Sequence, residues 1–92
     1  MFTLSAALTF YIPQSTSLKD KRQVCRSIID KGQQRFNASI SEVDTQDIHQ
    51  TMTLGVAVVS GEYSHAREML DDIVRYMERN TEAELISVQW SE

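Results

Sequence analysis

The chain has 92 residues, of which 41% are hydrophobic and 24% are charged, with one Pro and three Gly. This composition excludes a disordered or fibrous protein and predicts a single small domain, residues 1–92, whose modest core would benefit from self-association or a partner. The net charge of −4 is unevenly distributed, because residues 1–36 carry six basic and two acidic residues whereas residues 37–92 carry three basic and eleven acidic ones.

The first segment alternates strictly. From Phe2 to Ile12 every second residue is apolar, which predicts a strand with one buried face that ends at Pro13. Because this segment has no basic start and no continuous apolar run, we expect neither a signal peptide nor a membrane span. A single cysteine, Cys25, excludes an internal disulfide and a Cys-x-x-Cys site, so we expect a cytoplasmic protein.

A helix should follow the first strand. Ser17 begins a capping-box pattern, Ser-x-x-Asp, in which Asp20 replaces the usual Glu. Apolar residues then recur at steps of three and four along one helical face. This face consists of Leu18, Cys25, Ile28, Ile29, Gly32 and Phe36, with Val24 at its margin.

The rest of the chain predicts two more strands, a helix and a final strand. Residues 37–43 form a short strand with Ala38 and Ile40 pointing inward, a polar connection follows, and residues 51–60 alternate again. A helix from Tyr63 to Arg79 has one apolar face. The last strand spans Leu85 to Trp90, and its buried face is not determined by the pattern.

The order βαββαβ is that of the ferredoxin-like α+β sandwich, in which one four-stranded antiparallel sheet of order 4-1-3-2 carries both helices on one face. This topology brings the start of the first helix close to the connection between the second and third strands. The cations Lys19, Lys21 and Arg22 lie at the positive end of the helix dipole, which is unfavourable by about 0.3–1 kcal/mol each. Nearby acids could compensate for them.

Three segments resemble a known family: SLKDKR (17–22), RFNASISEVDTQD (35–47) and TLGVAVVS (53–60). They are similar to those of the bacterial YlxP-like family, domain of unknown function family 503, over nearly the whole chain. The resemblance implies a ferredoxin-like fold and no established activity. Family members are often encoded among translation genes, which implies a role associated with ribosomes or RNA. His49 and Thr51 depart from the family pattern, so no role is carried over to His49.

The basic residues of the first helix are the main site candidates. Lys19, Arg22 and Arg26 fall within about 60° of one another around the helix, and Lys21 lies on the other flank of the apolar face. One hypothesis is that these residues bind phosphates of RNA or of a ribosomal particle. The alternative is that they pair internally with Asp20 and with the polar cluster opposite, which comprises Glu42, Asp44, Asp47 and Gln50.

Other chemistry has less support in the sequence. Asp44, Asp47 and His49 are possible metal ligands, but Asp residues of this kind more often shape turns, and we expect neither a metal nor a cofactor. Cys25 lies on the apolar face, where a thiol is usually inert. No catalytic constellation is recognisable, so we expect a binding module rather than an enzyme.

The solvent-facing side of the sheet is unusual because its central strands offer small uncharged side chains. Only Tyr11 is aromatic there, so base stacking across the sheet is not expected. A second subunit could approach such a face closely, and a homodimer is the simplest case. The expected interface residues are Thr3, Ser5, Thr9, Thr51 and Thr53. The second functional hypothesis is therefore a homo-oligomeric structural or ligand-sensing module.

Overall fold

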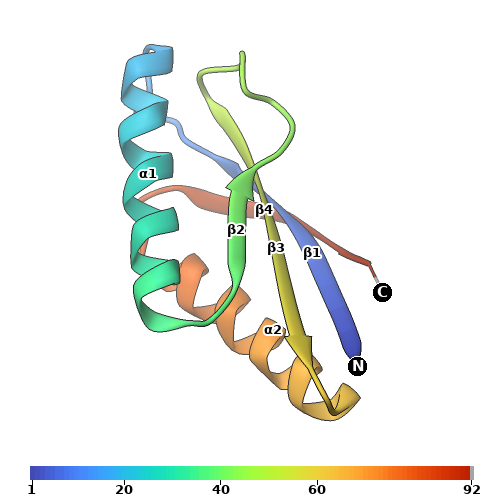
Figure 1. The fold of residues 1–92 in the computed structure, drawn as a ribbon. Coiled ribbons are helices and arrows are strands. Elements are labelled where there is room, and N and C mark those ends of the chain that lie inside the picture. Colours follow the sequence, from blue (N-terminus) through green and yellow to red (C-terminus); the bar gives the residue numbers. More distant parts are fainter. Residues whose placement is uncertain (92) are drawn as a thin grey trace.

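The computed structural model describes residues 1–91 and confirms the predicted order of elements. They are β1 (Phe2–Tyr11), α1 (Leu18–Arg35), β2 (Ser39–Glu42), β3 (Thr51–Ser60), α2 (Tyr63–Arg79) and β4 (Glu84–Ser91). The strands form one antiparallel sheet of order β2-β3-β1-β4, which is the predicted order 4-1-3-2 viewed from the opposite edge. Both helices cover the same face of this sheet, with α1 against β2 and β3, and α2 against β1 and β3 (Figure 1).

The two ten-residue strands β1 and β3 form the centre of the sheet and pair without interruption from Phe2 opposite Ser60 to Tyr11 opposite Thr51. Alternation places the even-numbered residues of both strands beneath the helices, where Leu8, Phe10 and Leu54 are fully buried. The odd-numbered residues consequently face the opposite, uncovered side of the sheet.

The buried faces of α1 and α2 pack on the sheet and complete the core. On α1 the buried residues are Lys21, Cys25, Ile28 and Gly32, and on α2 they are Ala66, Leu70, Ile73, Val74 and Met77. Gly32 permits a close approach to β2, because a Cβ atom there would lie 2.8 Å from Cδ1 of Ile40. The apolar face of α1 thus contains one charged residue, Lys21, which the sequence pattern did not assign to it.

Two strands differ from the sequence prediction. β2 is shorter than residues 37–43, because Val43 already belongs to the connection that leads to β3. β4 is longer than predicted and contains a bulge opposite Thr9 and Phe10. The bulge explains why the pattern did not determine the buried face of this strand. Leu85 and Val88 pack against the core, whereas Ile86 between them is 56% exposed.

Within residues 1–91, neither helix combines the length and the apolar character needed to cross a membrane.

Candidate functional site

The start of α1 is held by local hydrogen bonds. The hydroxyl of Ser17 accepts a hydrogen bond from the backbone N–H of Asp20 at 3.1 Å, as the capping box predicts. The Asp20 carboxylate accepts hydrogen bonds from the backbone N–H and the hydroxyl of Thr16, at 3.0 and 2.8 Å, instead of bonding back to Ser17. These bonds, the side-chain one first, lower the pKa of Asp20 below its ordinary value of 3.8.

Lys21 is buried, which corrects its assignment to an external phosphate site. Its side chain has no exposed surface, and its ammonium group lies 2.9 Å from Oε2 of Glu42. It also donates hydrogen bonds to the backbone carbonyls of Thr45, Gln46 and Thr51, at 2.5, 3.1 and 3.3 Å. Lys21 therefore joins α1 to both ends of the β2–β3 connection, and no external ligand can reach it.

The contact between Lys21 and Glu42 is an ion pair rather than a fourth hydrogen bond. An ammonium has three N–H donors, and the three carbonyls use them. Within residues 1–91, Oε2 of Glu42 is accordingly buried without a hydrogen-bond partner. Of the acids that the sequence offered as internal partners, Glu42 is the one that pairs with a cation of α1.

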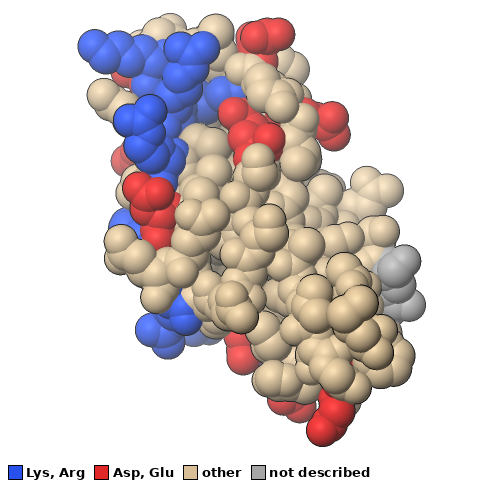
Figure 2. Space-filling model, viewed as in Figure 1, with Lys and Arg blue, Asp and Glu red and all other residues tan. Residues whose placement is uncertain are grey.

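The other basic residues of α1 are exposed. Lys19, Arg22 and Arg26 face solvent, and none of them forms a salt bridge within the described part of the chain. We call these three residues the basic stripe. In Figure 2 most of the visible Lys and Arg atoms gather over α1. The surface beside them, over the strands, is largely uncharged.

The β2–β3 connection holds the remaining members of the polar cluster. Asp44 and Asp47 are exposed and, within residues 1–91, form no salt bridge. Gln50 reaches back to the β1–α1 connection, where its side-chain N–H donates to the carbonyl of Pro13 at 3.4 Å and its backbone carbonyl accepts from Ile12. The segment therefore lies next to the start of α1, as the topology predicts.

The proposed interface residues divide into two groups. Thr3 is exposed on the uncovered side of the sheet, and Ser5, Thr9 and Thr51 are half-buried there. Thr53 is only 6% exposed, and the hydroxyl group of Thr45 donates a hydrogen bond to the hydroxyl oxygen of Thr53 at 3.2 Å. The inclusion of Thr53 as a contact residue was therefore wrong, since the chain itself already covers this position.

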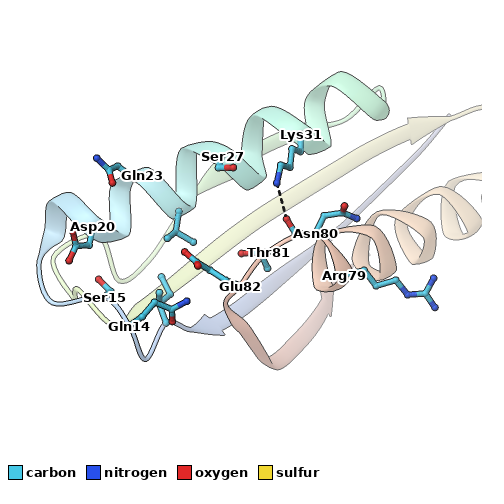
Figure 3. A pocket seen from close by; sticks show the side chains of 12 residues that line it. Gln14, Ser15, Asp20, Gln23, Ser27, Lys31, Arg79, Asn80, Thr81 and Glu82 are labelled. Carbon is cyan, nitrogen blue, oxygen red and sulfur yellow. Dashed lines mark hydrogen bonds between the residues drawn. The ribbon is translucent and has the colours of Figure 1, made fainter.

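A hollow on the surface was not predicted from the sequence. It has a volume of about 740 Å³ and lies between α1 and the α2–β4 connection, over a floor that includes Ile12 and Val24. Lys31 crosses it to donate to the carbonyl of Asn80 at 3.3 Å, and Glu82 points into the space below α1 (Figure 3). Its two walls come from segments about fifty residues apart, so periodicity gave no signal for it. Charges of both signs line the hollow, which does not favour an anion over a cation.

Thiol, imidazole and carboxylate groups are the ones that nucleophilic or metal chemistry would use. Cys25 is buried, and burial raises the pKa of its thiol to about 11, so the reactive thiolate is scarce. Nδ1 of His65 lies 3.1 Å from the hydroxyl of Ser60, which itself accepts from the backbone N–H of Glu62 at the start of α2. Among the described residues, His, Cys, Asp and Glu form no group of three that could hold a metal ion.

Comparison with known proteins gives two consistent results. A family model described as "Protein of unknown function (DUF503)" matches residues 3–90. The chain is also 35% identical over 68 residues to "Uncharacterized protein YlxP" of Bacillus subtilis (strain 168), in an alignment that covers 74% of each chain.

Proposed function

The chain belongs to the DUF503 family of proteins of unknown function, and we propose that it is a cytoplasmic, non-enzymatic module that binds RNA, alone or in a ribosomal particle, through phosphate contacts of the basic stripe. One observation carries this proposal: Lys19, Arg22 and Arg26 are exposed on one side of α1 without salt-bridge partners in residues 1–91. Exposed cations that are not held in a salt bridge are available to a polyanion.

The spacing of the stripe suits a phosphate backbone. At a rise of 1.5 Å per residue, Lys19 and Arg26 are separated by about 10 Å along the helix axis, so their long side chains can contact neighbouring phosphates of one strand. Lys19 also lies in the first turn, where the helix dipole attracts anions. Asp44 and Asp47 lie near the start of the helix on another side and would repel a polyanion. The contact is therefore confined to the outer side of α1.

Such a contact has a defined dependence on salt. Three phosphate contacts to a single strand predict a slope of about −2 in a plot of log affinity against log salt concentration, and hence about a 20-fold loss between 50 and 200 mM salt. Phosphate contacts carry no sequence information, so the affinity should not depend on base sequence.

The experiment measures binding to a labelled single-stranded RNA by fluorescence anisotropy at several salt concentrations, and to ribosomal particles by co-sedimentation. The variant replaces all three stripe residues with Ala, and the control replaces Lys31, Arg75 and Arg79 with Ala, because these are also exposed cations and the loss of charge is equal. We expect the stripe variant to lose at least about 10-fold in affinity together with most of the salt slope. Equal losses in both variants, or no binding by the wild type, would contradict the proposal.

A second candidate is a homo-oligomeric structural module in which the charged end of the molecule is paired internally. Lys21 favours it, because its charge is used entirely within the chain. In this case, replacing Lys21 would lower stability while the stripe variant would leave every partner unchanged. The exposure of the basic stripe makes the RNA-binding module the better supported of the two.

A further inference from the structure

The uncovered face of the sheet is almost free of charge. Its central rows are Thr3, Ser5, Ala7 and Thr9 on β1 and Gly55, Ala57 and Val59 on β3, with Ser39 and Ser41 beside them on β2 and Ser87, Gln89 and Ser91 on β4. Glu84, opposite Tyr11, is the charged residue on this side of the paired strands, and it lies at one end. Solvent-facing sheets normally carry many charged side chains, whereas here the charged residues belong to the helical layer and the connections.

Neutrality favours a second copy of the chain as the occupant. Where two identical faces meet around a twofold axis, each charged residue near the axis approaches its own copy, and like charges across an interface cost several kcal/mol. A neutral face avoids this penalty automatically. The net charge of −4 opposes self-association at the acidic connections. At physiological salt this repulsion is screened beyond about 8 Å, so it opposes association through a neutral face less strongly.

The backbone groups at the centre of the face are already satisfied, because those of β1 and β3 are paired within the sheet. The hydroxyls of Thr9, Thr53 and Thr45 form a chain of contacts at 3.4 and 3.2 Å, so these three also keep their partners when water is removed. The remaining hydroxyl and amide groups of the face would need partners on the second copy, because an unpaired polar group is costly to bury.

Exposed apolar side chains stand around the same face. Val59 pairs with Thr3 and is 58% exposed, and Tyr11 at the other end of β1 is 39% exposed. Val43 is 44% exposed and lies over Gly55, where a Cβ atom would be 2.8 Å from its methyl group. Val59 and Tyr11 stand at the two ends of the face and Val43 stands over its centre, and covering them with a second copy would remove their apolar surface from water.

The size and shape of the face also suit a dimer. The accessible length of β1 and β3 is about 25 Å and the width of four strands is about 19 Å, so two faces would bury about 1,000 Å² in total. This reaches the lower limit for a specific interface, so we expect a weak dimer. A hollow of about 480 Å³ lies on the face, with Ser5, Ala57 and Gln89 among its lining residues. Two twisted sheets pack face to face with their strands within about 30° of each other, and a twofold axis along the strands gives this alignment.

We propose that the chain forms a homodimer in which two copies pack uncovered sheet face against uncovered sheet face, with the twofold axis close to the Ala7 and Gly55 pair. The helical layers then lie on the outside, and both basic stripes stay accessible. The inference therefore goes beyond the proposed RNA binding and does not depend on it.

The test measures mass by light scattering from about 1 to about 300 µM, a range that brackets a micromolar dissociation constant. Ala57→Arg places a cation on the face, and Gln34→Arg adds the same charge to an exposed position of α1. Ala7→Cys and Gln34→Cys are treated with a short bismaleimide cross-linker as an independent measurement. Cys25 does not interfere because it is buried. Circular dichroism verifies that each variant is folded.

We expect the wild type and Gln34→Arg to reach twice the monomer mass, and Ala57→Arg to raise the dissociation constant at least about 10-fold, or 1.4 kcal/mol. Ala7→Cys should give a covalent dimer and Gln34→Cys should not. A wild type that stays monomeric at the highest concentration would overturn the proposal. So would a dimer that Ala57→Arg leaves unchanged, which would indicate pairing at the edge of β4, or equal cross-linking at both positions. If Ala57→Arg does not fold, the cross-linking result decides.

Discussion

Lys21 and the basic stripe of Lys19, Arg22 and Arg26 lie on the same helix, yet they have opposite environments. Lys21 is fully buried and bound to three carbonyls and Glu42, whereas the stripe residues are exposed. All four side chains are cationic, so residue type does not explain the difference. Position around the helix axis does, because Lys21 shares its face with Cys25 and Ile28, four and seven residues further on. One face supports the fold and the other is free for a partner.

The strongest test of this comparison is Lys21→Met, which keeps the length of the side chain and removes its charge. Glu42 then loses its cation and three backbone carbonyls lose their donor, and breaking a buried ion pair in this way costs about 3–5 kcal/mol. For a domain of this size, the melting temperature should fall by at least about 15 °C. Thermal and urea unfolding followed by circular dichroism would measure it.

Arg22→Met is the matched control for this substitution. It removes an exposed cation one position further along α1, and it should change the free energy of unfolding by less than about 0.5 kcal/mol. Similar losses in the two variants would mean that the buried and exposed cations do not differ in their contribution to stability.

A smaller effect is expected for Glu42→Gln. The substitution removes the negative partner, but the ammonium of Lys21 keeps its bonds to the carbonyls of Thr45, Gln46 and Thr51. We expect a loss of about 1–3 kcal/mol, because a buried charge remains with only dipoles to stabilise it. Urea unfolding of both variants gives the comparison. A loss as large as that of Lys21→Met would show that the ion pair, and not the carbonyl bonds, dominates.

The sequence was sufficient to predict the fold because its hydrophobic patterns and its helix-capping pattern agreed with one another. The alternation in residues 2–12 and 51–60, the Ser17 cap and the two apolar helical faces all favour one topology. Strand ends were less accurate: β2 ends at Glu42, although the backbone N–H of Val43 still donates to the carbonyl of Thr53 at 2.9 Å. A bulge in β4 interrupts the alternation on which that prediction depends. Local tertiary contacts determine both features, and no periodicity contains them.

Whether each cation of α1 is buried or exposed could be predicted only in part. Lys21, Cys25, Ile28 and Gly32 follow the spacing of one helical face, so the signal that Lys21 is buried was present in the chain. Charged residues are rarely buried without partners, and this rule argued against the burial of Lys21. Lys21 can nevertheless be buried because its partners are mostly the backbone carbonyls of Thr45, Gln46 and Thr51. Every residue has a backbone carbonyl, so residue types do not show which carbonyls will bind a buried lysine.

The same comparison predicts little change when the stripe residues are replaced together by Ala. None of them forms a salt bridge within residues 1–91, and Lys19 lies at the unfavourable end of the helix dipole. The free energy of unfolding should therefore stay within about 1 kcal/mol of wild type. Urea unfolding of the variant used for RNA binding measures it directly. A large loss of stability would show that the stripe supports the fold, and would remove the distinction between the two sides of α1.

The smallest effect on stability is expected for a substitution of Asp20. This variant tests the contribution of the carboxylate at the start of α1 separately from that of the cations of the helix. Hydrogen bonds from Thr16 keep the pKa of Asp20 below 3.8 in the folded state. The ionised carboxylate is therefore more stable in the folded protein than in the unfolded chain. Its contribution to stability is therefore complete above pH 3.8 and is lost as the pH falls through the lower folded pKa. Asp20→Asn should have a slightly lower melting temperature than wild type at pH 7, and the difference should disappear in strong acid. A difference that stays constant with pH would mean that Asp20 acts through its shape alone, and the electrostatic account of this helix end would then depend on Lys21 and Glu42 only.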